Sequence, residues 1–271
     1  MKKFILFILI ITAVISGYRV FHVYQDYQKA YSYYTTMQEE YIEVQTTITP
    51  IISNVLPSPT PTAIITPKIT TPEPRHTTIE QPPIQVDFNK LQKQNKEVIG
   101  WIYSENTIIN YPILQTSNNI YYLRHLMNKT YSASGSIFMD SINNNMFTDD
   151  NSILYGHHMR NGSMFASLEK YKEQEYFNIH NELWLLTPTQ NYKITPFAGL
   201  VVSPSREDYF ITNFNSITEQ NEYIKFAINN STFQGIITPN NADKLITLTT
   251  CDYTFENAKF ILLGILIPVV E

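Results

Sequence analysis

Short apolar stretches alternate with polar segments throughout residues 84–271. Apolar and β-branched runs that are bounded by glycine, proline, asparagine or serine are typical of β-strands. The predicted strands cover residues 100–103, 108–113, 136–139, 152–155, 182–187, 192–202, 244–250 and 260–270. Many short strands with helices inserted between them predict a mainly β fold, built as a closed or nearly closed barrel.

Helical spacing of apolar residues predicts short helices between these strands. Asp87 is a candidate N-cap for the first, and Asn119 for the second, at residues 120–127. A third is expected at residues 164–171. The sequence Ser-Ile-Thr-Glu at 216–219 has the pattern of a capping box, which opens a fourth helix.

The N-terminal segment, residues 1–23, has a different pattern, with lysines followed by an apolar run. The stretch from Phe4 to Val23 reaches the ~20 residues that a spanning helix needs if Arg19 and His22 extend to the far interface. Lysines on the near side favour a cytoplasmic N-terminus and an extracellular domain. We interpret the segment as a signal anchor in the cell membrane. The alternative is a cleaved signal peptide, with small residues at 13–17 near the cut.

Three further segments follow this predicted anchor. Residues 24–45 are rich in tyrosine and glutamine and are expected to form a juxtamembrane segment. Residues 46–83 contain many of the chain's 15 prolines, interleaved with threonine and serine, which predicts an extended linker without a core. At ~3.1 Å per residue such a linker spans on the order of 100 Å and holds a domain away from the membrane. Residues 84–271 are the predicted catalytic domain.

Composition excludes several classes of function. The 271 residues carry a net charge of −5, which argues against a nucleic-acid partner. A single cysteine rules out an intramolecular disulfide, a tetrathiolate zinc site and a Cys-x-x-Cys redox motif. With 8 glycines and neither of the usual phosphate-loop patterns, no nucleotide is expected. We predict no cofactor and no metal.

The cysteine is the first candidate for chemistry. Cys251 follows the predicted strand 244–250, at the point where the chain leaves the sheet. A thiol there is reachable while its backbone is held rigid, which suits a nucleophile. The alternative is a buried cysteine that acts as a small hydrophobic residue.

A histidine pair follows another strand. Gly156, His157 and His158 come directly after the strand at 152–155. Adjacent strand residues point to opposite faces, so only one of the two rings can face a given cleft. The alternatives are a structural histidine and a metal ligand, although zinc needs further ligands that do not accompany the pair.

A lysine opens the last strand. If strands 244–250 and 260–267 pair as a hairpin, Cys251 and Lys259 lie side by side at one end of the sheet. A cation there lowers the pKa of a thiol and stabilises an oxyanion. The alternative is a solvated lysine that flanks an apolar strand as a gatekeeper.

These segments resemble those of a known family. Thr-Leu-Thr-Thr-Cys at 247–251 resembles the Thr-Leu-x-Thr-Cys signature of sortases, and Tyr-Gly-His-His-Met-Arg-Asn-Gly-Ser-Met-Phe at 155–165 resembles the histidine segment of class B sortases. Gly-Trp-Ile at 100–102, Tyr-Pro-Ile at 111–113 and Tyr-Tyr-Leu at 121–123 are similar to the class B N-terminal pattern. The resemblance covers essentially all of the predicted catalytic domain. It implies an eight-stranded sortase barrel with added helices, and a cysteine transpeptidase that anchors surface proteins to the Gram-positive cell wall.

The resemblance also implies roles for residues. Cys251 is the nucleophile and His157 the general acid and base. The substrate is a sorting-signal peptide of Asn-Pro-x-Thr or Leu-Pro-x-Thr type, which is cleaved after threonine through a thioacyl-enzyme. An amine of a cell-wall precursor or of a pilin accepts the acyl group. Thr249 and Thr250 are expected to line the groove.

The sequence departs from the family at one position. Where the family has an arginine at the start of the final strand, this chain has Lys259, a point charge in place of a planar fork of donors. Arg160 and Arg206 are the alternative cations. The departure leaves open a weakened domain that binds sorting peptides with little turnover, and the remaining alternative is a hydrolytic cysteine protease.

Overall fold

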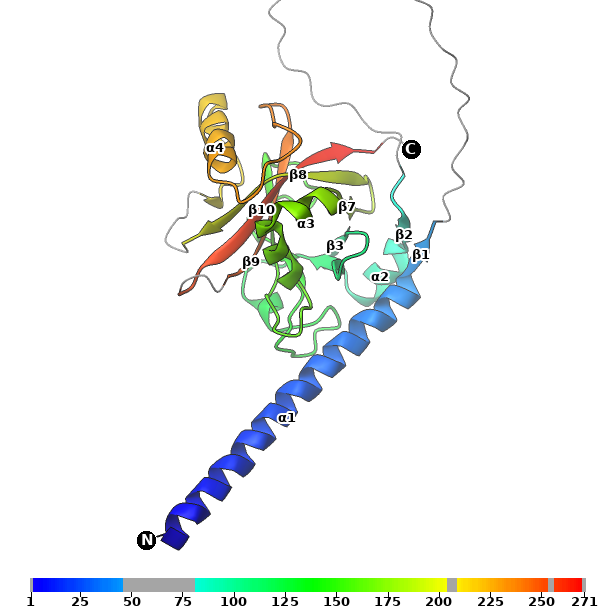
Figure 1. Ribbon diagram of the computed structural model, residues 1–271. Coiled ribbons are helices and arrows are strands. Elements are labelled where there is room, and N and C mark those ends of the chain that lie inside the picture. Colours follow the sequence, from blue (N-terminus) through cyan, green and yellow to red (C-terminus); the bar gives the residue numbers. More distant parts are fainter. Residues whose placement is uncertain (1, 46–80, 204–208, 253–255, 270–271) are drawn as a thin grey trace, which may run out of the picture.

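The computed structural model describes residues 2–45, 81–203, 209–252 and 256–269, and within them a closed barrel dominates (Figure 1). The eight strands of the barrel follow the order β10-β8-β7-β3-β4-β5-β6-β9, and β9 pairs back with β10. The strands are β3 (Val98–Tyr103), β4 (Asn110–Leu114), β5 (Ile137–Met139), β6 (Asn151–Tyr155), β7 (Leu183–Leu186), β8 (Tyr192–Val202), β9 (Lys244–Cys251) and β10 (Lys259–Pro268). The predicted mainly β fold, with an eight-stranded barrel and added helices, is confirmed.

Two strand pairings bring distant parts of the chain to one edge of the barrel. β6 runs parallel to β9, with Tyr155 opposite Thr249. β9 runs antiparallel to β10, with Cys251 opposite Lys259. The ends of β6 and β9 and the start of β10 therefore lie next to one another, although β6 is far from the other two in sequence.

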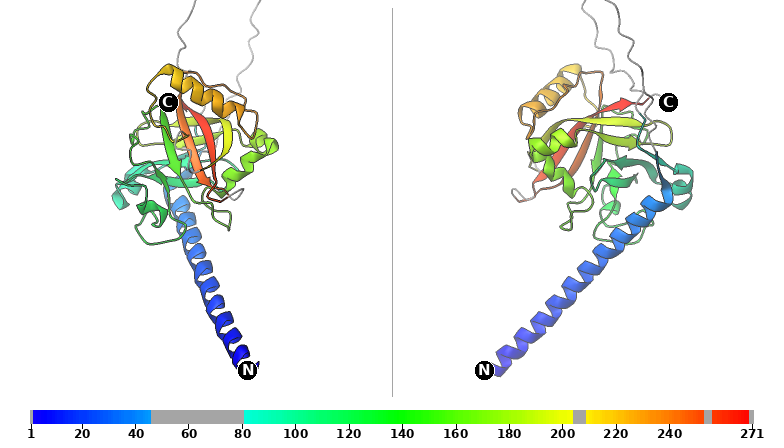
Figure 2. Two further views of the ribbon diagram at one scale, coloured as in Figure 1. Left: turned by 90° about the vertical axis from the view of Figure 1, so that its left-hand side faces the viewer. Right: turned by 45° about the vertical axis from the view of Figure 1, so that its right-hand side comes forward.

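Side chains alternate between the two faces of these strands. Leu248 and Phe260 belong to the main apolar core inside the barrel. Ile261 and Leu263 belong to a second apolar cluster on the outer face, where α4 (Ile217–Asn229) packs. Figures 1 and 2 show α4 lying against this side of the barrel. Ile261 is opposite Thr249, and Lys259 is opposite Cys251, two residues further along each strand. Residues two apart on a strand share a face, so Cys251 and Lys259 lie on the outer face with Ile261.

The N-terminal helix is an integral part of this arrangement. α1 (Lys2–Tyr41) is one continuous helix, long and apolar enough near its start to cross a membrane. After α1, β1 (Ile42–Val44) pairs with β2 (Ile84–Val86) in a separate two-stranded sheet. The predicted linker, residues 46–83, follows β1 and precedes β2, and its residues 46–80 lie outside the described residues.

The first and last of the predicted helices form as expected. At α2 (Phe88–Gln94), the Asp87 carboxylate accepts a hydrogen bond from the backbone N–H of Lys90 at 2.9 Å. At α4, the Ser216 hydroxyl accepts from the N–H of Glu219 at 3.1 Å. Both helices therefore begin with the side-chain cap that the sequence predicts.

The two middle helices differ from the prediction. The helix expected at 120–127 is wrong, because only a 3₁₀ turn, η1 (Tyr121–Leu123), forms there, and Ile120 is 74% exposed. The predicted N-cap at Asn119 does not form, because its side chain accepts a hydrogen bond from Ser141 N; the Asn118 side chain accepts from the N–H groups of Ile120 and Tyr121. The third is a 3₁₀ helix, η2 (Ala166–Lys172), followed by α3 (Gln174–Ile179).

Candidate active site

The cysteine and the lysine meet at the shared edge. Cys251 is the last residue of β9, Lys259 is the first residue of β10, and the two are directly opposite each other. Directly opposed residues have Cβ atoms about 4.5–5.5 Å apart on the same face. The Cys251 thiol is exposed. The structure thus brings the predicted nucleophile and the predicted cation side by side.

Two aromatic rings hold the lysine. The Lys259 ammonium lies 5.6 Å from the ring centre of Tyr155 and 5.4 Å from that of Phe210. Tyr155 is itself fixed, because its hydroxyl donates to the carboxylate of Asp140 at 2.8 Å. A cation over an aromatic face gains about 0.5–2 kcal/mol, and here the two rings keep a flexible side chain at the strand end.

Gly156 connects the end of β6 to His157. The N–H of Gly156 donates to the carbonyl of Thr249 at 3.1 Å and extends the parallel ladder past the end of β6. A Cβ on Gly156 would lie 2.4 Å from Ile137 Cδ1 and 2.6 Å from the Phe165 ring, so a side chain does not fit. His157 follows. Continued alternation from Tyr155 predicts that it lies on the face that carries Cys251.

One nitrogen of His157 is committed to a hydrogen bond. Its Nε2 lies 2.8 Å from the carbonyl oxygen of Leu123. A carbonyl only accepts, so Nε2 carries the hydrogen and the neutral ring keeps a lone pair on Nδ1. Burial lowers the pKa of His157 below its ordinary value; the Leu123 carbonyl opposes this shift and the charge of Arg124 adds to it. The geometry favours a neutral imidazole that can take up a proton at Nδ1.

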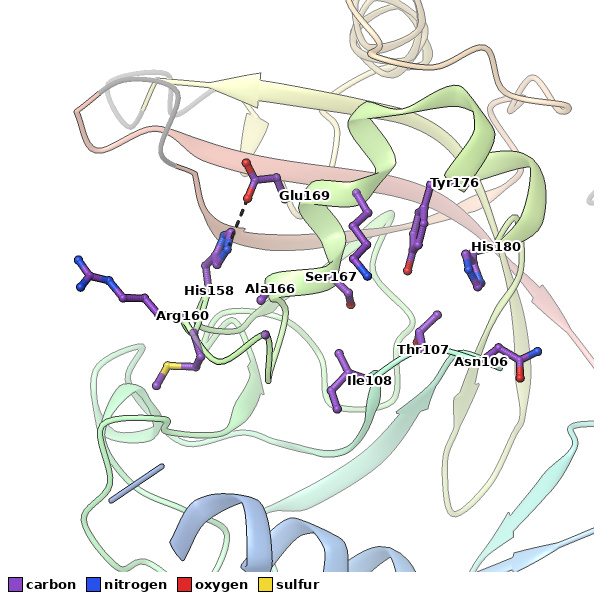
Figure 3. Close-up of a pocket in the computed structure, with 13 residues that line it drawn as sticks. Asn106, Thr107, Ile108, His158, Arg160, Ala166, Ser167, Glu169, Tyr176 and His180 are labelled. Atoms are coloured by element: carbon purple, nitrogen blue, oxygen red, sulfur yellow. Dashed lines mark ion pairs between the residues drawn. The ribbon is translucent and has the colours of Figure 1, made fainter. Parts of the chain in front are cut away.

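The second histidine has a different environment. His158 Nδ1 donates to the backbone carbonyl of Cys251 at 3.1 Å, and His158 Nε2 lies 3.4 Å from a carboxylate oxygen of Glu169. Figure 3 shows this ring turned toward Glu169 of η2. His158 therefore holds the backbone of the cysteine residue, while the adjacent His157 lies on the cysteine's face.

A chain of charges continues from His158 to the residue after the cysteine. Lys172 Nζ lies 3.0 Å from Glu169 Oε1 and 2.5 Å from Asp252 Oδ2. The Asp252 side chain is fully buried, and its N–H donates to the carbonyl of Ala258 at 2.7 Å. The sequence reasoning missed this network. Its one signal was an acidic residue next to the cysteine, and the partners lie in a segment about eighty positions earlier.

The two threonines expected to line the groove lie on different faces. Thr249 is opposite Ile261, on the face of Cys251, and is 2% exposed. Thr250 is opposite Phe260, whose ring is inside the barrel. The structure therefore brings Thr249 close to the site beneath the surface, and it does not bring the side chain of Thr250 there.

The strand pairing that places Lys259 opposite Cys251 does not involve Arg160. Arg160 is exposed, and Figure 3 shows its side chain extending away from the other labelled residues. Arg206 lies outside the described residues. Lys259 is thus the cation that the structure places beside Cys251.

A cavity of about 530 Å³ lies behind His158 and is lined by Glu169, Tyr176 and His180 as well (Figure 3). Cys251 and Lys259 are not among its lining residues. Within the described ranges, no group of three or more histidine, cysteine or acidic side chains is placed to hold a metal ion.

Comparisons with known proteins agree with this arrangement. A family model described as the sortase domain matches residues 102–264. Sortase B of Listeria monocytogenes is 35% identical over 187 residues, which are 68% of this chain and 75% of that protein. A Staphylococcus aureus sortase B–substrate complex has a TM-score of 0.64 at 28% identity and covers 68% of this chain and 85% of that chain. A structure of sortase B complexed with triglycine has the same TM-score and identity and covers 68% of this chain and 86% of that chain.

A closed barrel with an exposed cysteine beside a cation, and a histidine on the same face, suits an enzyme that works through an acyl-cysteine intermediate. The family-model match and the sequence identity define the family within that class. This chain belongs to the sortase family of cysteine transpeptidases, and the relatives compared above are class B sortases.

Proposed function

We propose that this sortase cleaves a C-terminal cell-wall sorting signal after threonine and joins the new carboxyl end to an amine. The observation that carries the proposal is the shared face of Cys251, Lys259 and His157 at the open end of β9. The structures of a sortase B with substrate and of a sortase B with triglycine support a peptide substrate and an amine acceptor for this chain as well.

The first half of the reaction forms the thioacyl-enzyme. His157 Nδ1 takes the proton of the Cys251 thiol, and the sulfur attacks the threonine carbonyl of an Asn-Pro-x-Thr or Leu-Pro-x-Thr signal. As the peptide C–N bond breaks, the proton on His157 passes to the leaving amine. The lowered pKa of His157 suits this step, because the ring is neutral before the attack.

The second half transfers the acyl group. An amine of a cell-wall precursor, or a pilin lysine, attacks the thioester, its proton passes to His157, and the C–S bond breaks to restore the Cys251 thiol. In both halves a negative charge develops on the carbonyl oxygen. The Lys259 ammonium, held beside the sulfur by Tyr155 and Phe210, is the group that stabilises it.

The N-terminal part of α1 is proposed as a membrane anchor with the catalytic domain outside the cell. Residues 4–23 are apolar and exposed along the helix, and α1 runs without a break through the small residues at 13–17. Lysines precede the run, and Tyr18, Phe21 and Tyr24 lie near its far end, as is typical of membrane interfaces.

One observation favours a second function. Lysine in place of the family's arginine removes a planar donor fork from the oxyanion site, and the loss of one such donor costs ~10²–10³ in rate. A domain that binds sorting peptides with little turnover is therefore the alternative. A cysteine protease that uses water in place of the amine is a third reading of the same residues.

Turnover assays of the full chain in detergent micelles separate these functions. Fluorogenic peptides with either signal are incubated with and without triglycine, and products are identified by mass spectrometry. We expect cleavage after threonine and a ligated product that requires triglycine. Peptide binding without a thioacyl adduct supports the weakened domain, and cleavage that ignores triglycine supports the protease.

The Cys251→Ala variant is the control for the nucleophile. It should retain peptide binding and lose both the adduct and the ligated product. Residual turnover in this variant would refute the assignment of Cys251.

A further inference from the structure

The part of α1 beyond the apolar segment packs along the barrel. Ala30, Tyr34, Met37 and Tyr41 recur at helical spacing and are each at most 5% exposed. Burial of one complete face over this length makes the second half of α1 part of the domain's core.

Hydrogen bonds attach the same half of α1 to the barrel domain at three positions along the helix. Asp26 accepts from the N–H of Ala133 at 2.8 Å, near the apolar segment. The Tyr34 hydroxyl donates to the carbonyl of Gly135 at 2.7 Å, and the Gln38 side chain donates to the carbonyl of Asn110 at 2.8 Å. The helix therefore cannot swivel on the domain without breaking contacts along its length.

The chain after α1 returns to the place it left. Val44 pairs with Ile84, and the N–H of Gln45 donates to the carbonyl of Pro83 at 2.9 Å. Whatever lies between these points is connected at both ends to the same two-stranded sheet. The connection between the proposed anchor and the domain is therefore α1 itself.

The helix also sets the height of the domain. α1 has 40 residues, which at ~1.5 Å per residue make it about 60 Å long. A bilayer core takes up about 30 Å of that length, up to about Val23. Asp26, the first residue bonded to the barrel domain, comes only three positions later. The domain therefore begins at the level where the apolar segment ends.

The loop that Asp26 holds also supports the catalytic histidine. Residues 121–135 include Ala133, which binds Asp26, and Leu123, whose carbonyl binds His157. This loop contains Arg124, which is exposed, and Tyr131, which is 70% exposed, and its sequence has no acidic residue. An exposed tyrosine and a basic side chain are the residues that lipid headgroups attract.

The views of the whole molecule agree with this placement. In Figures 1 and 2, β10 begins on the side of the barrel toward which the N-terminal half of α1 extends, and it ends on the opposite side, near the C-terminus. Since Cys251 is opposite the first residue of β10, the catalytic edge lies on the side nearer the apolar helix.

We propose that the loop at 121–135 is a membrane-contact surface, and that α1 holds the barrel on anionic lipid headgroups with its Cys251 edge facing the bilayer. The inference rests on the membrane anchor that forms part of the proposed function. In this orientation the enzyme binds substrates that are held at the membrane surface, and α1 fixes the distance of the Cys251 edge from the bilayer.

Fluorescence quenching tests this orientation without any need for activity. The full chain is inserted into vesicles of phosphatidylcholine and phosphatidylglycerol that contain a lipid with a nitroxide on its headgroup. A thiol-reactive fluorophore is attached at the native Cys251, or, in the Cys251→Ala background, at Tyr131→Cys, Thr189→Cys or Tyr24→Cys. Thr189 is exposed in the β7–β8 turn, next to the end of β10, and is the matched far-side control.

We expect a strong loss of fluorescence at positions 24 and 131, a clear loss at 251 and little loss at 189. Equal quenching at 131 and 189 would overturn the fixed orientation while leaving the anchor intact. Absence of quenching at 24 would show that the helix does not insert, and this proposal would fall with the anchor, whereas peptide turnover by Cys251 is measured separately.

Two further variants distinguish a rigid helix from a flexible linker. Deletion of residues 46–80, which joins Gln45 to Gln81, keeps the contacts of α1 described above and should leave the quenching pattern unchanged. A flexible Gly/Ser insertion between Tyr24 and Gln25 should remove the difference between positions 131 and 189. The opposite pair of results would contradict the proposal.

Discussion

The ion pair between Lys172 and Asp252 lies directly after Cys251, the proposed nucleophile, and its two partners differ in burial. The Asp252 side chain is fully buried, whereas that of Lys172 is 23% exposed and has Glu169 as a second carboxylate at 3.0 Å. Although partial burial works against its charge, the carboxylates of Asp252 and Glu169 raise the pKa of Lys172. Removal of the lysine should therefore harm the fold more than neutralisation of the aspartate.

The magnitudes follow from this asymmetry. Lys172→Met leaves a carboxylate buried without its cation, which costs about 3–5 kcal/mol of unfolding free energy. Asp252→Asn leaves Lys172 with Glu169 and a route to solvent, so we expect a loss of about 1–2 kcal/mol, the range for a polar group that loses one partner. The double variant should be no less stable than Lys172→Met alone, because the uncompensated charge is gone.

The loss in Lys172→Met should also grow with pH. Burial favours the protonated form of a carboxyl without a cation, so the folded variant binds more protons than its unfolded state and loses stability as pH rises. The slope is at most about 1.36 kcal/mol per pH unit for one group.

Urea unfolding of the full chain in detergent, followed by the fluorescence of the buried Trp101 and Trp184, measures these differences. Additive losses in the double variant, or a larger loss in Asp252→Asn than in Lys172→Met, would refute the assignment of a compensated buried charge. A loss in Lys172→Met that is independent of pH would do the same.

Four further predictions concern turnover of soluble signal peptides and the packing beneath the site. Lys259→Arg should leave kcat/KM unchanged or raise it, whereas Lys259→Ala should lower it by about 10²-fold; full activity of the alanine variant would contradict the role of this cation. His157→Ala should abolish ligation, while His158→Ala, which loses a backbone contact, should be milder, and the reverse order would mean that the other ring is catalytic. Because burial lowers the pKa of His157, the acid limb of the kcat/KM profile should lie below pH 6.5, and Arg124→Gln should move it upward by removing a nearby charge; a limb that does not move would refute that coupling. Gly156→Ala should cost about 1–3 kcal/mol in urea unfolding and reduce activity, since its Cβ collides with Ile137 and Phe165, and an unchanged stability would show that the two side chains can move aside.

The barrel was predictable because its strands carry their own signals. The strand at 192–202 matches β8 at both ends, and those at 244–250 and 260–270 differ from β9 and β10 by one or two residues. At the predicted helix 120–127 only the turn Tyr121–Leu123 forms, and after it the carbonyl of Arg124 accepts from the N–H of Ser132 in place of a helical partner. Apolar spacing alone does not distinguish a helix from a loop that buries the same residues.

The docking of α1 was not predictable from the same patterns. Tyr34 and Met37 are buried by the barrel, but a tyrosine-rich segment next to an apolar helix has the same appearance when it is solvated. The pairing of Ile42–Val44 with Ile84–Val86 joins two three-residue strands across a long segment, and strands this short carry almost no periodicity. Only the pairing shows that the strands on either side of the proline-rich segment lie next to each other.

Within the candidate site, the sequence indicated the candidate side chains, and the structure adds the contacts that position them. The carbonyl of Leu123 selects the tautomer of His157, and no pattern of residue types reveals a backbone acceptor. The rings of Tyr155 and Phe210 bear directly on the replacement of arginine by Lys259. A lysine normally loses rotamer freedom when it is held at one point, and that loss is the main disadvantage of a flexible ammonium against a planar guanidinium. Because two aromatic faces already confine the Lys259 ammonium beside the thiol, part of that loss has occurred on folding, and the charge is in place for the oxyanion of the proposed reaction.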